Sequence, residues 1–294
     1  MEIRPHIDYL ITDKLPQFPV CILSETRPNS STVRIMKAAG ITPFVYVNEK
    51  SPYFSEYQQI DGINLITCPT NGLHIAHKRQ YIVDHQRSLG QDYMWQIDDD
   101  IEGFYTKGIQ KPTKVLIPPS IALSSAEALF DSNRHVSVHF TPLLDFMLIF
   151  KTDQYVPRAT YWKETPKQYS GFVLLLNIKM MEEHGIKYNP NNPTNFDDIE
   201  LHGHFAAEQL PVLRLEFISF REEKIPSVAF NDRIDRNRSV VKVCKFINET
   251  YNDEIYYTKI DKKGLNISLT PVRRKNCIDF TANMDPEYLK TLPI

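Results

Sequence analysis

Three consecutive carboxylates, Asp98 to Asp100, follow the apolar segment 93–97 of this chain. A short apolar run is typical of a buried strand, so the acids stand at its carboxyl end, where open α/β sheets place their ligand sites. Such closely spaced oxygens can bind Mg²⁺ or Mn²⁺, whose other positions go to water and to phosphate oxygens. The triplet therefore predicts a metal site for a diphosphate. The competing interpretation is a solvated acidic turn or a helix start, because Asp is favoured in both.

Side chains from neighbouring segments are candidates for contact with a nucleotide. Glu49 closes an expected strand, where an acid can hydrogen-bond a ribose or a base, although a surface carboxylate explains it equally well. A helix expected at 73–89 carries Lys78 and Arg79 towards the acids. Arg79 is the preferred partner of a diphosphate, because a guanidinium matches phosphate oxygens in bidentate geometry. Lys78 is interpreted as a solvated charge.

The segments before the triplet predict a unit that positions it. Ser31 or Thr32 can cap a helix that stops at Gly40, and this helix separates two strand-like runs. Strand, helix and strand within about thirty residues form a βαβ unit. Together with the later segments, this gives expected strands at 20–23, 43–47, 63–68 and 93–97, a short helix or turn at 53–57 and the helix at 73–89.

After the triplet the pattern is mixed. The Lys- and Pro-rich segment 106–119 is expected to be a loop, followed by a helix that begins at Ser120 or Ser124 and runs through Phe130. Asp197 or Asp198 is expected to start another helix that runs to about Leu210, and acids at a helix start often act only as caps. The other expected elements are strands at 135–140, 146–150, 170–177, 212–220, 254–260 and 265–269, and helices at 178–184 and 240–251.

Composition bounds the class of protein. With 294 residues, of which 42% are hydrophobic, the chain can bury one large or two small cores. The net charge of −2 identifies no partner, but residues 214–275 carry 14 Lys and Arg against 9 Asp and Glu, whereas residues 1–213 carry 19 against 24. The C-terminal third is therefore a candidate surface for an anionic partner, with an ordinary mixed surface as the alternative.

Targeting and redox signals favour a soluble intracellular protein, located in the cytoplasm. The four cysteines are widely spaced and lack a Cys-x-x-Cys pair, which is typical of reduced thiols. The first residues contain no apolar core of signal-peptide length, and no segment approaches the roughly 18 apolar residues that a membrane span needs. Neither a membrane contact nor an obligate protein partner is predicted.

The order of these motifs resembles the GT-A class of nucleotide-sugar-dependent glycosyltransferases. The resembling features are the βαβ unit, an Asp-x-Asp motif at Asp98 to Asp100, a glycine-containing acceptor strand at 170–172, and an acidic pair at 197–198, about 97 residues after the triplet. The resemblance spans about residues 19–215. It implies an α/β fold with a Rossmann-like mixed sheet flanked by helices, a lead-in at 1–18, and a C-terminal α+β extension at 216–294.

Within this class, three short segments look most like phage DNA-modifying glycosyltransferases of the TET/JBP-associated type. These segments are 25–28, 77–80 and 96–100. The resemblance implies transfer of a sugar from a nucleotide sugar, with a UDP-sugar preferred, to the hydroxymethyl group of 5-hydroxymethylcytosine in double-stranded DNA. A glycan or protein acceptor is the alternative, and a binding module that lacks activity is the alternative of a different class. A nucleotidyltransferase is disfavoured, because no Gly-rich phosphate loop follows the first strand.

The resemblance also assigns roles to residues. It implies Asp100 as the principal ligand of Mn²⁺ or Mg²⁺, Asp98 as a residue that faces ribose and metal, and Asp198 as the general base of an inverting reaction. The chain has Asp-Asp where the class usually has Glu-Asp, so Asp197 and Glu200 stay alternatives for the base. The remaining expected contacts are Glu25, Thr26, Arg27 and Glu49 beside the nucleotide, and His202 or His204 as a further metal or phosphate contact.

A DNA acceptor would need a cationic surface. Five basic residues in the extension are expected to bind phosphates and to make binding salt-dependent. Neither the identity of the sugar nor flipping of the target base follows from the residues. The five are Arg233, Arg236, Arg238, Lys242 and Lys245.

Overall fold

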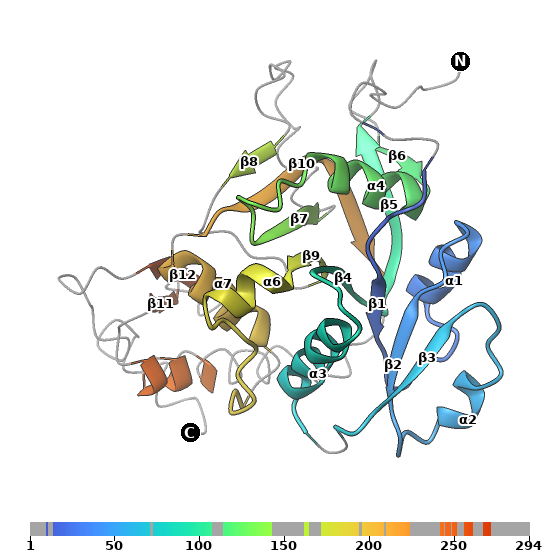
Figure 1. Ribbon diagram of the computed structural model, residues 1–294, viewed down its shortest axis with the longest axis horizontal. Coiled ribbons are helices and arrows are strands. Elements are labelled where there is room, and N and C mark those ends of the chain that lie inside the picture. Colours follow the sequence, from blue (N-terminus) through green and yellow to red (C-terminus); the bar gives the residue numbers. More distant parts are fainter. Residues whose placement is uncertain are drawn as a thin grey trace.

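The computed structural model describes most of residues 10–223 and parts of the C-terminal region (Figure 1). The described residues are 10, 14–70, 73–107, 114–142, 162–164, 172–193, 196–208, 210–223, 242–243, 245–247, 249–251, 256–260 and 267–271. The helices are α1 (Ser31–Ala38), α2 (Phe54–Tyr57), α3 (Ile75–Ser88), α4 (Pro119–Leu129), α6 (Ile178–Glu183) and α7 (Asp197–Ala207). The strands are β1 (Val20–Leu23), β2 (Phe44–Asn48), β3 (Asn64–Cys68), β4 (Tyr93–Asp98), β5 (Ile101–Lys107), β6 (Lys114–Ile117), β7 (Ser137–Pro142), β8 (Trp162–Glu164), β9 (Val173–Asn177), β10 (Val212–Glu222), β11 (Tyr256–Ile260) and β12 (Ile267–Pro271).

One mixed sheet of ten strands organises the fold, with strand order β3-β2-β1-β4-β9-β7-β10-β5-β6 and β8 paired to β10. The first four strands in this order are parallel to their neighbours; Ile22 of β1, for example, pairs with Val45 of β2 and Ile97 of β4. Strand β9 then joins β4 in antiparallel orientation. Because parallel strands end at the same edge, the carboxyl ends of β1, β2 and β4 meet there, and the acidic triplet lies on that edge.

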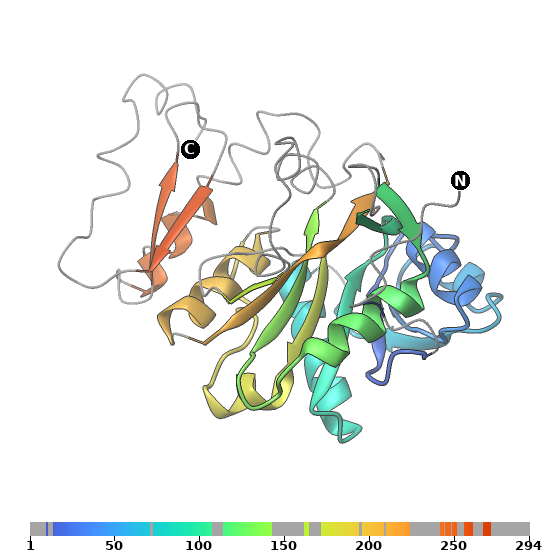
Figure 2. The same ribbon diagram turned by 90° about the horizontal axis from the view of Figure 1, so that it is seen from above.

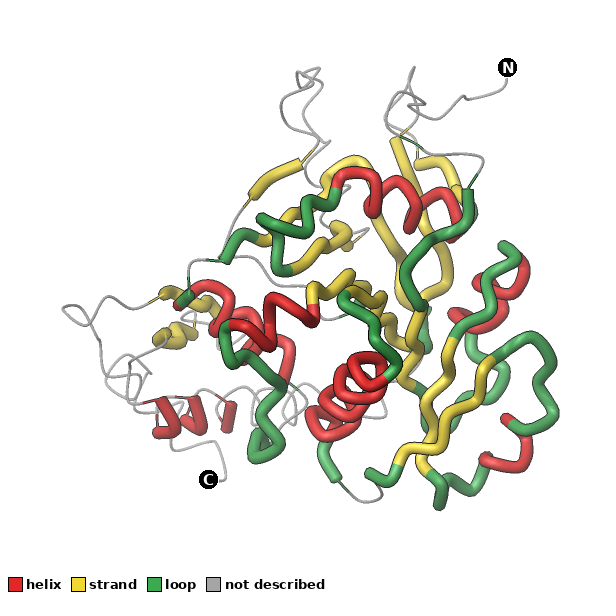
Figure 3. The backbone as a smooth tube through the Cα atoms, in the orientation of Figure 1, coloured by secondary structure: helices red, strands yellow, loops and turns green. Residues whose placement is uncertain are grey.

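Helices cover both faces of the sheet (Figure 3). Alternate residues of the central strands point to opposite faces, so Ile22 enters one core and its neighbour Cys21 enters the other. The first core contains residues of α1, α4 and α2, and the second contains residues of α3, α6 and α7. The triplet lies beside the start of α1, and Arg79 of α3 connects its first acid, Asp98, to the start of α7.

The C-terminal elements pair with each other and not with the large sheet. Strands β11 and β12 form a separate two-stranded antiparallel sheet. This hairpin lies at the end of the molecule opposite to α1 and α2 (Figure 2), and both of its strands contact α7.

Three predictions of local structure are wrong. Helix α1 is capped by Ser30, whose side chain accepts a hydrogen bond from the amide of Val33, and not by Ser31 or Thr32. Helix α4 begins at Pro119 and so includes both serines proposed as its start, because proline is favoured in the first helical turn. The expected loop at 106–119 contains strand β6 and the end of β5, which pair with each other.

The other expected elements are present within a few residues of their predicted bounds. The expected strand at 146–150 lies outside the described residues, as do Ser170 and Gly171 of the expected acceptor strand. Cys21 and Cys68 are free and buried, as expected of reduced thiols; Cys244 and Cys277 are not among the described residues. Within the described part of the chain, no helix is long and apolar enough to cross a membrane.

Candidate active site

The turn that carries the acidic triplet is fixed by the start of α1. Thr32 Oγ1 donates to the carbonyl oxygen of Asp98 at 2.7 Å and accepts from the amide of Ile101 at 2.8 Å. On the other side of the strand, the amide of Asp98 donates to the carbonyl of Phe172 at 2.9 Å. The sequence suggested Thr32 only as a helix cap, but its hydroxyl joins β4, the triplet and β5.

Arg27 and Ser24 hold the middle acid of the triplet. The Arg27 guanidinium lies 3.0 Å from Asp99 Oδ1 and 3.6 Å from Asp100 Oδ2, and Ser24 Oγ donates to Asp99 Oδ2 at 2.6 Å. Tyr57 from α2 holds this loop in turn, since its hydroxyl contacts Ser24 Oγ at 2.6 Å and accepts from the Arg27 amide at 3.0 Å. Asp99 therefore supports the site, and Arg27, expected beside the nucleotide, stands against the acids.

The electrostatics of the triplet fit a divalent cation. Burial raises the pKa of Asp98 to about 8; Arg79 opposes this shift, while the charges of Asp100 and Asp99 add to it. Burial also raises the pKa of Asp100, and its Oδ1 atom is buried without a hydrogen-bond partner among the described residues. A metal ion could be coordinated by that oxygen and would neutralise the negative charge of the three carboxylates.

The carboxylates of Asp98 and Asp100 stay partly open, with side chains 20% and 27% exposed. Among the described residues, no three His, Cys, Asp or Glu side chains come together as a metal-binding group. The chain thus offers two acids of the kind that binds Mg²⁺ or Mn²⁺ when substrate phosphates and water complete the coordination.

Arg79, predicted to contact a diphosphate, is almost entirely buried and engaged by partners inside the protein. Its side chain is 5% exposed and contacts one acid of the triplet and one acid of the pair at the start of α7. Nη2 lies 2.9 Å from Asp98 Oδ1, and Nε lies 2.9 Å from Asp197 Oδ2. A third contact joins Nη1 to Gln96 Oε1 at 3.2 Å. The guanidinium is therefore an internal link between β4 and α7, inaccessible to a ligand.

Exposure distinguishes the three acids that were alternatives for the base. Asp197 is 2% exposed and paired with Arg79, and Glu200 is 1% exposed. Glu200 accepts hydrogen bonds from Asn189 at 2.9 Å, from Asn192 at 2.7 Å and from the Tyr251 hydroxyl. Asp198, in the same helical turn, is only partly buried. Burial raises the pKa of Asp197 to about 7 and also raises the pKa of Asp198, while Arg79 opposes both shifts.

The two histidines of α7 have hydrogen-bond partners inside the protein. His202 is 2% exposed; its Nδ1 lies 2.6 Å from the carbonyl oxygen of Asp198, and its Nε2 lies 2.9 Å from His139 Nε2. His204 Nε2 contacts the Tyr251 hydroxyl at 3.2 Å. Because these ring nitrogens face partners inside the protein, neither histidine is retained as a candidate metal ligand.

A second polar network lies where β1, β2 and β3 end. Glu25 Oε2 accepts from Lys78 Nζ at 2.6 Å and from Asn48 Nδ2 at 2.6 Å, and Thr70 Oγ1 donates to Asn48 Oδ1 at 2.6 Å. The Lys78 side chain is 7% exposed, so its interpretation as a solvated charge is wrong. Glu25 is 40% exposed, and the network binds one of its oxygens while the other has no contact among the described residues.

The other predicted contacts are less constrained. Thr26 and Glu49 are exposed at the same edge of the sheet, after β1 and β2. Of the basic residues expected to bind DNA, Lys242 and Lys245 are exposed, and Lys245 lies 3.9 Å from Glu249. Arg233, Arg236 and Arg238 lie outside the described residues.

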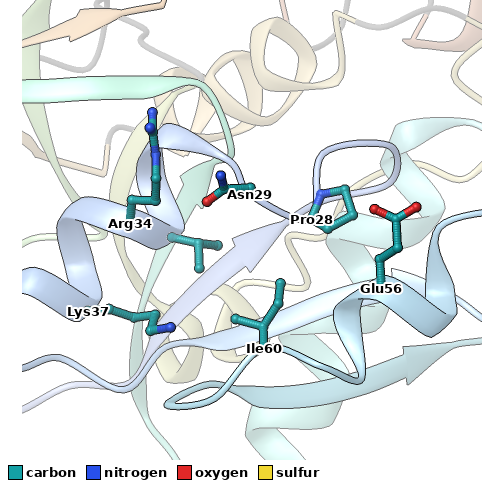
Figure 4. A pocket seen from close by; sticks show the side chains of 7 residues that line it. Pro28, Asn29, Arg34, Lys37, Glu56 and Ile60 are labelled. Carbon is teal, nitrogen blue, oxygen red and sulfur yellow. The ribbon is translucent and has the colours of Figure 1, made fainter.

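A cavity of about 410 Å³ lies beside this site, between α1 and α2 (Figure 4). Arg34 and Lys37 of α1 and Glu56 of α2 line it, together with Pro28, Asn29, Val33 and Ile60. It shares the loop after β1 with the site but contains none of the triplet acids, so we do not assign the substrate to it.

Comparison with a solved mannosyltransferase structure places this fold in the GT-A class. A mannosyltransferase from Pyrobaculum calidifontis, solved with GDP-mannose and Mn²⁺, superposes with a TM-score of 0.53 at 13% identity, covering 84% of this chain and 67% of its own. A GalNAc-transferase solved with UDP, GalNAc and Mn²⁺ gives a TM-score of 0.47 at 11% identity, covering 82% of this chain and 50% of its own. No curated protein sequence matches the chain.

The family follows from the sequence itself. The family model of the TET-associated glycosyltransferases matches residues 18–227. The chain therefore belongs to this family and is a glycosyltransferase, which confirms the resemblance found in the motifs.

Proposed function

We propose that the protein transfers a sugar, with inversion, from a nucleotide sugar to the hydroxymethyl group of a modified pyrimidine in DNA, in a metal-dependent reaction. A UDP-sugar is the preferred donor, and 5-hydroxymethylcytosine in double-stranded DNA is the preferred acceptor. The main support for this reaction is that Arg79 pairs with one acid from each of two groups. It contacts Asp98 of the triplet and Asp197 of α7, and Asp197 is the neighbour of the partly exposed Asp198.

The donor would lie along the carboxyl edge of the parallel strands. Asp98 and Asp100 would hold Mn²⁺ or Mg²⁺, and the free oxygen of Glu25 would accept a hydrogen bond from the nucleotide, with Thr26 and Glu49 nearby. The metal, when bound, would stabilise the negative charge that develops on the leaving diphosphate. Lys78 and Asn48 hold Glu25 in place for this contact.

Asp198 would act as the general base. It would take the proton of the acceptor hydroxyl as that oxygen attacks the sugar, a contribution of typically about 10² to 10⁴-fold in rate. A raised pKa suits this role, because a base whose pKa approaches the working pH is the more effective proton acceptor. Buried Asp197 and Glu200 instead support the start and the first turn of α7.

The acceptor assignment rests on the family and on charge. Members of the family are expected to modify hydroxymethylated bases, and the basic residues of the C-terminal extension suit a phosphate backbone. The extension contacts α7, and its Tyr251 donates a hydrogen bond to Glu200, two residues after Asp198, so an acceptor bound to the extension would lie near the proposed general base. A glycan or protein acceptor on the same catalytic machinery is the second candidate.

Release of nucleoside diphosphate tests this function. A panel of UDP-sugars and other nucleotide sugars is incubated with Mn²⁺ and either hydroxymethylated or unmodified duplex DNA. We expect release only with the hydroxymethylated duplex and loss of about 10²-fold or more in kcat for Asp198→Asn, with Glu208→Gln, an exposed acid just after the same helix, as the matched control. No DNA-dependent release with any donor would reject the acceptor, and full activity of Asp198→Asn would reject the base.

A further inference from the structure

One buried cation joins the two halves of the candidate active site. Arg79 lies on α3, and its guanidinium contacts Asp98 at the end of β4 and Asp197 at the start of α7, each at 2.9 Å. We propose that Arg79 is a positioning residue that couples the metal-binding end of β4 to the turn of α7 that carries Asp198. This inference rests on the proposed function, and it adds what fixes the position of the general base Asp198 relative to the sugar donor.

The contact is built into the core and is more than a surface ion pair. Gln96 of β4 accepts from Arg79 Nη1 at 3.2 Å and from the Tyr188 hydroxyl at 2.5 Å through the same oxygen, Oε1. The Tyr188 amide in turn donates to Gln80, the next residue of α3, at 2.8 Å. The guanidinium is thus held by β4, by α7 and, through Gln96, by the segment that follows α6.

The chemistry of the link requires a guanidinium. Its Nη2 atom donates a hydrogen bond to Asp98, and its Nε atom lies 2.9 Å from Asp197 as an ion pair, whereas a lysine ammonium is a single point charge on a flexible chain. Removing one partner of a buried ion pair leaves an uncompensated charge, so the carboxylate that loses its partner is expected to move or to take up a proton. A lysine at this position would satisfy one acid and release the other.

The contacts of Arg79 explain why the triplet and the acidic pair of α7, about 97 residues apart, can act on one substrate. Asp197 precedes Asp198 directly, so a shift of Asp197 also shifts the base relative to the donor. A misplacement of about 1 Å in a catalytic constellation costs about 10²-fold in rate. Loss of the link should therefore lower kcat much more than it raises KM for the donor.

Arg79→Lys tests this, with Arg87→Lys as the matched control. Arg87 lies on the same helix, but its side chain is 36% exposed and pairs with Asp92 and Glu182 at the surface. We expect kcat of Arg79→Lys to fall by about 10²-fold with donor KM changed by less than about threefold, and Arg87→Lys to match the wild type. Unchanged kcat, or a loss confined to KM, would overturn the inference. If Arg79→Lys does not fold, Asp197→Asn, which keeps the side-chain shape, is judged by the same criteria.

Hydrogen exchange provides a readout that does not depend on turnover. Mn²⁺ with UDP, which has no sugar to reach Asp198, should slow exchange at the turn after β4 and also at the start of α7. In Arg79→Lys the protection should persist at the turn and disappear at α7. Protection of the turn without protection of α7 in the wild type would overturn the coupling while leaving the proposed function intact. Absence of any protection, together with absence of turnover, would instead reject the donor site.

Discussion

The buried histidine pair under α7 predicts a specific loss of stability in acid. His202 Nε2 lies 2.9 Å from His139 Nε2, and the rings meet edge to face at 89°. Because the carbonyl of Asp198 can only accept, the Nδ1 atom of His202, 2.6 Å away, must carry the proton, and its Nε2 then accepts from His139. Burial lowers the pKa values of both rings, so both are neutral in the folded protein near neutral pH.

Burial lowers the pKa of His202 to about 4; the hydrogen bond to the Asp198 carbonyl opposes this shift, and the charge of Arg79 adds to it. An unfolded chain has the ordinary histidine pKa near 6.5, so between these values the unfolded state binds a proton that the folded state does not. The stabilising contribution is complete above about pH 6.5 and is lost as the pH falls towards 4. Between pH 7.5 and pH 5 this loss is about 2 kcal/mol for His202 alone.

Other buried groups act in the opposite direction, so a variant is needed to isolate the histidine. The pKa values of Asp98 and Asp197 are raised to about 8 and about 7, so these acids bind protons more tightly in the folded state and favour it on acidification. Urea unfolding of the wild type and of His202→Gln is therefore compared at both pH values. The wild type should lose about 2 kcal/mol more than the variant on acidification. An equal change in the two proteins would refute the assignment of a buried neutral pair.

Three further perturbations test separate parts of the site and its frame. Asp100→Asn should weaken Mn²⁺ binding in the presence of UDP by tenfold or more, measured by calorimetry, whereas Glu102→Gln at the exposed rim of β5 should not. Tyr251→Phe should lower the free energy of unfolding by about 1 to 3 kcal/mol in a urea titration, because Glu200 loses a buried hydrogen-bond donor. Ser30→Ala should cost about 1 kcal/mol in the same assay, through loss of the cap of α1, and no change there would contradict the cap.

The parallel half of the sheet could be predicted from the sequence because its strands are short apolar runs separated by helices with clear ends. The hairpin of β5 and β6 could not. Residues 106–119 are rich in Lys and Pro, and their strand character comes from pairing with each other and with β10, about 100 residues away in sequence. Backbone pairing over such a distance leaves little trace in a local pattern.

The roles of the site residues likewise depend on contacts that a local sequence pattern does not reveal. Each acid could be singled out by its place after a strand or at a helix start, but the choice among Asp197, Asp198 and Glu200 depends on which of them is buried. That choice is made by the partners that the fold supplies, Arg79 for Asp197 and Asn189 for Glu200, and a local pattern does not identify them. Lys78 was misread for the same reason, since a charged helix residue is usually solvated, and the buried partners of Lys78 and Arg79 come only from the fold.

Mass spectrometry of the acceptor shows directly whether the protein glycosylates DNA. Duplex DNA containing 5-hydroxymethylcytosine is incubated with the protein, Mn²⁺ and a panel of nucleotide sugars, digested to nucleosides and compared with the same reaction of Asp198→Asn. We expect a 5-hydroxymethyl-2′-deoxycytidine heavier by one sugar residue, formed by the wild type and absent with the variant and after metal chelation. Unmodified nucleosides with every donor would contradict DNA glycosylation, and a sugar adduct formed equally by Asp198→Asn would contradict the catalytic assignment.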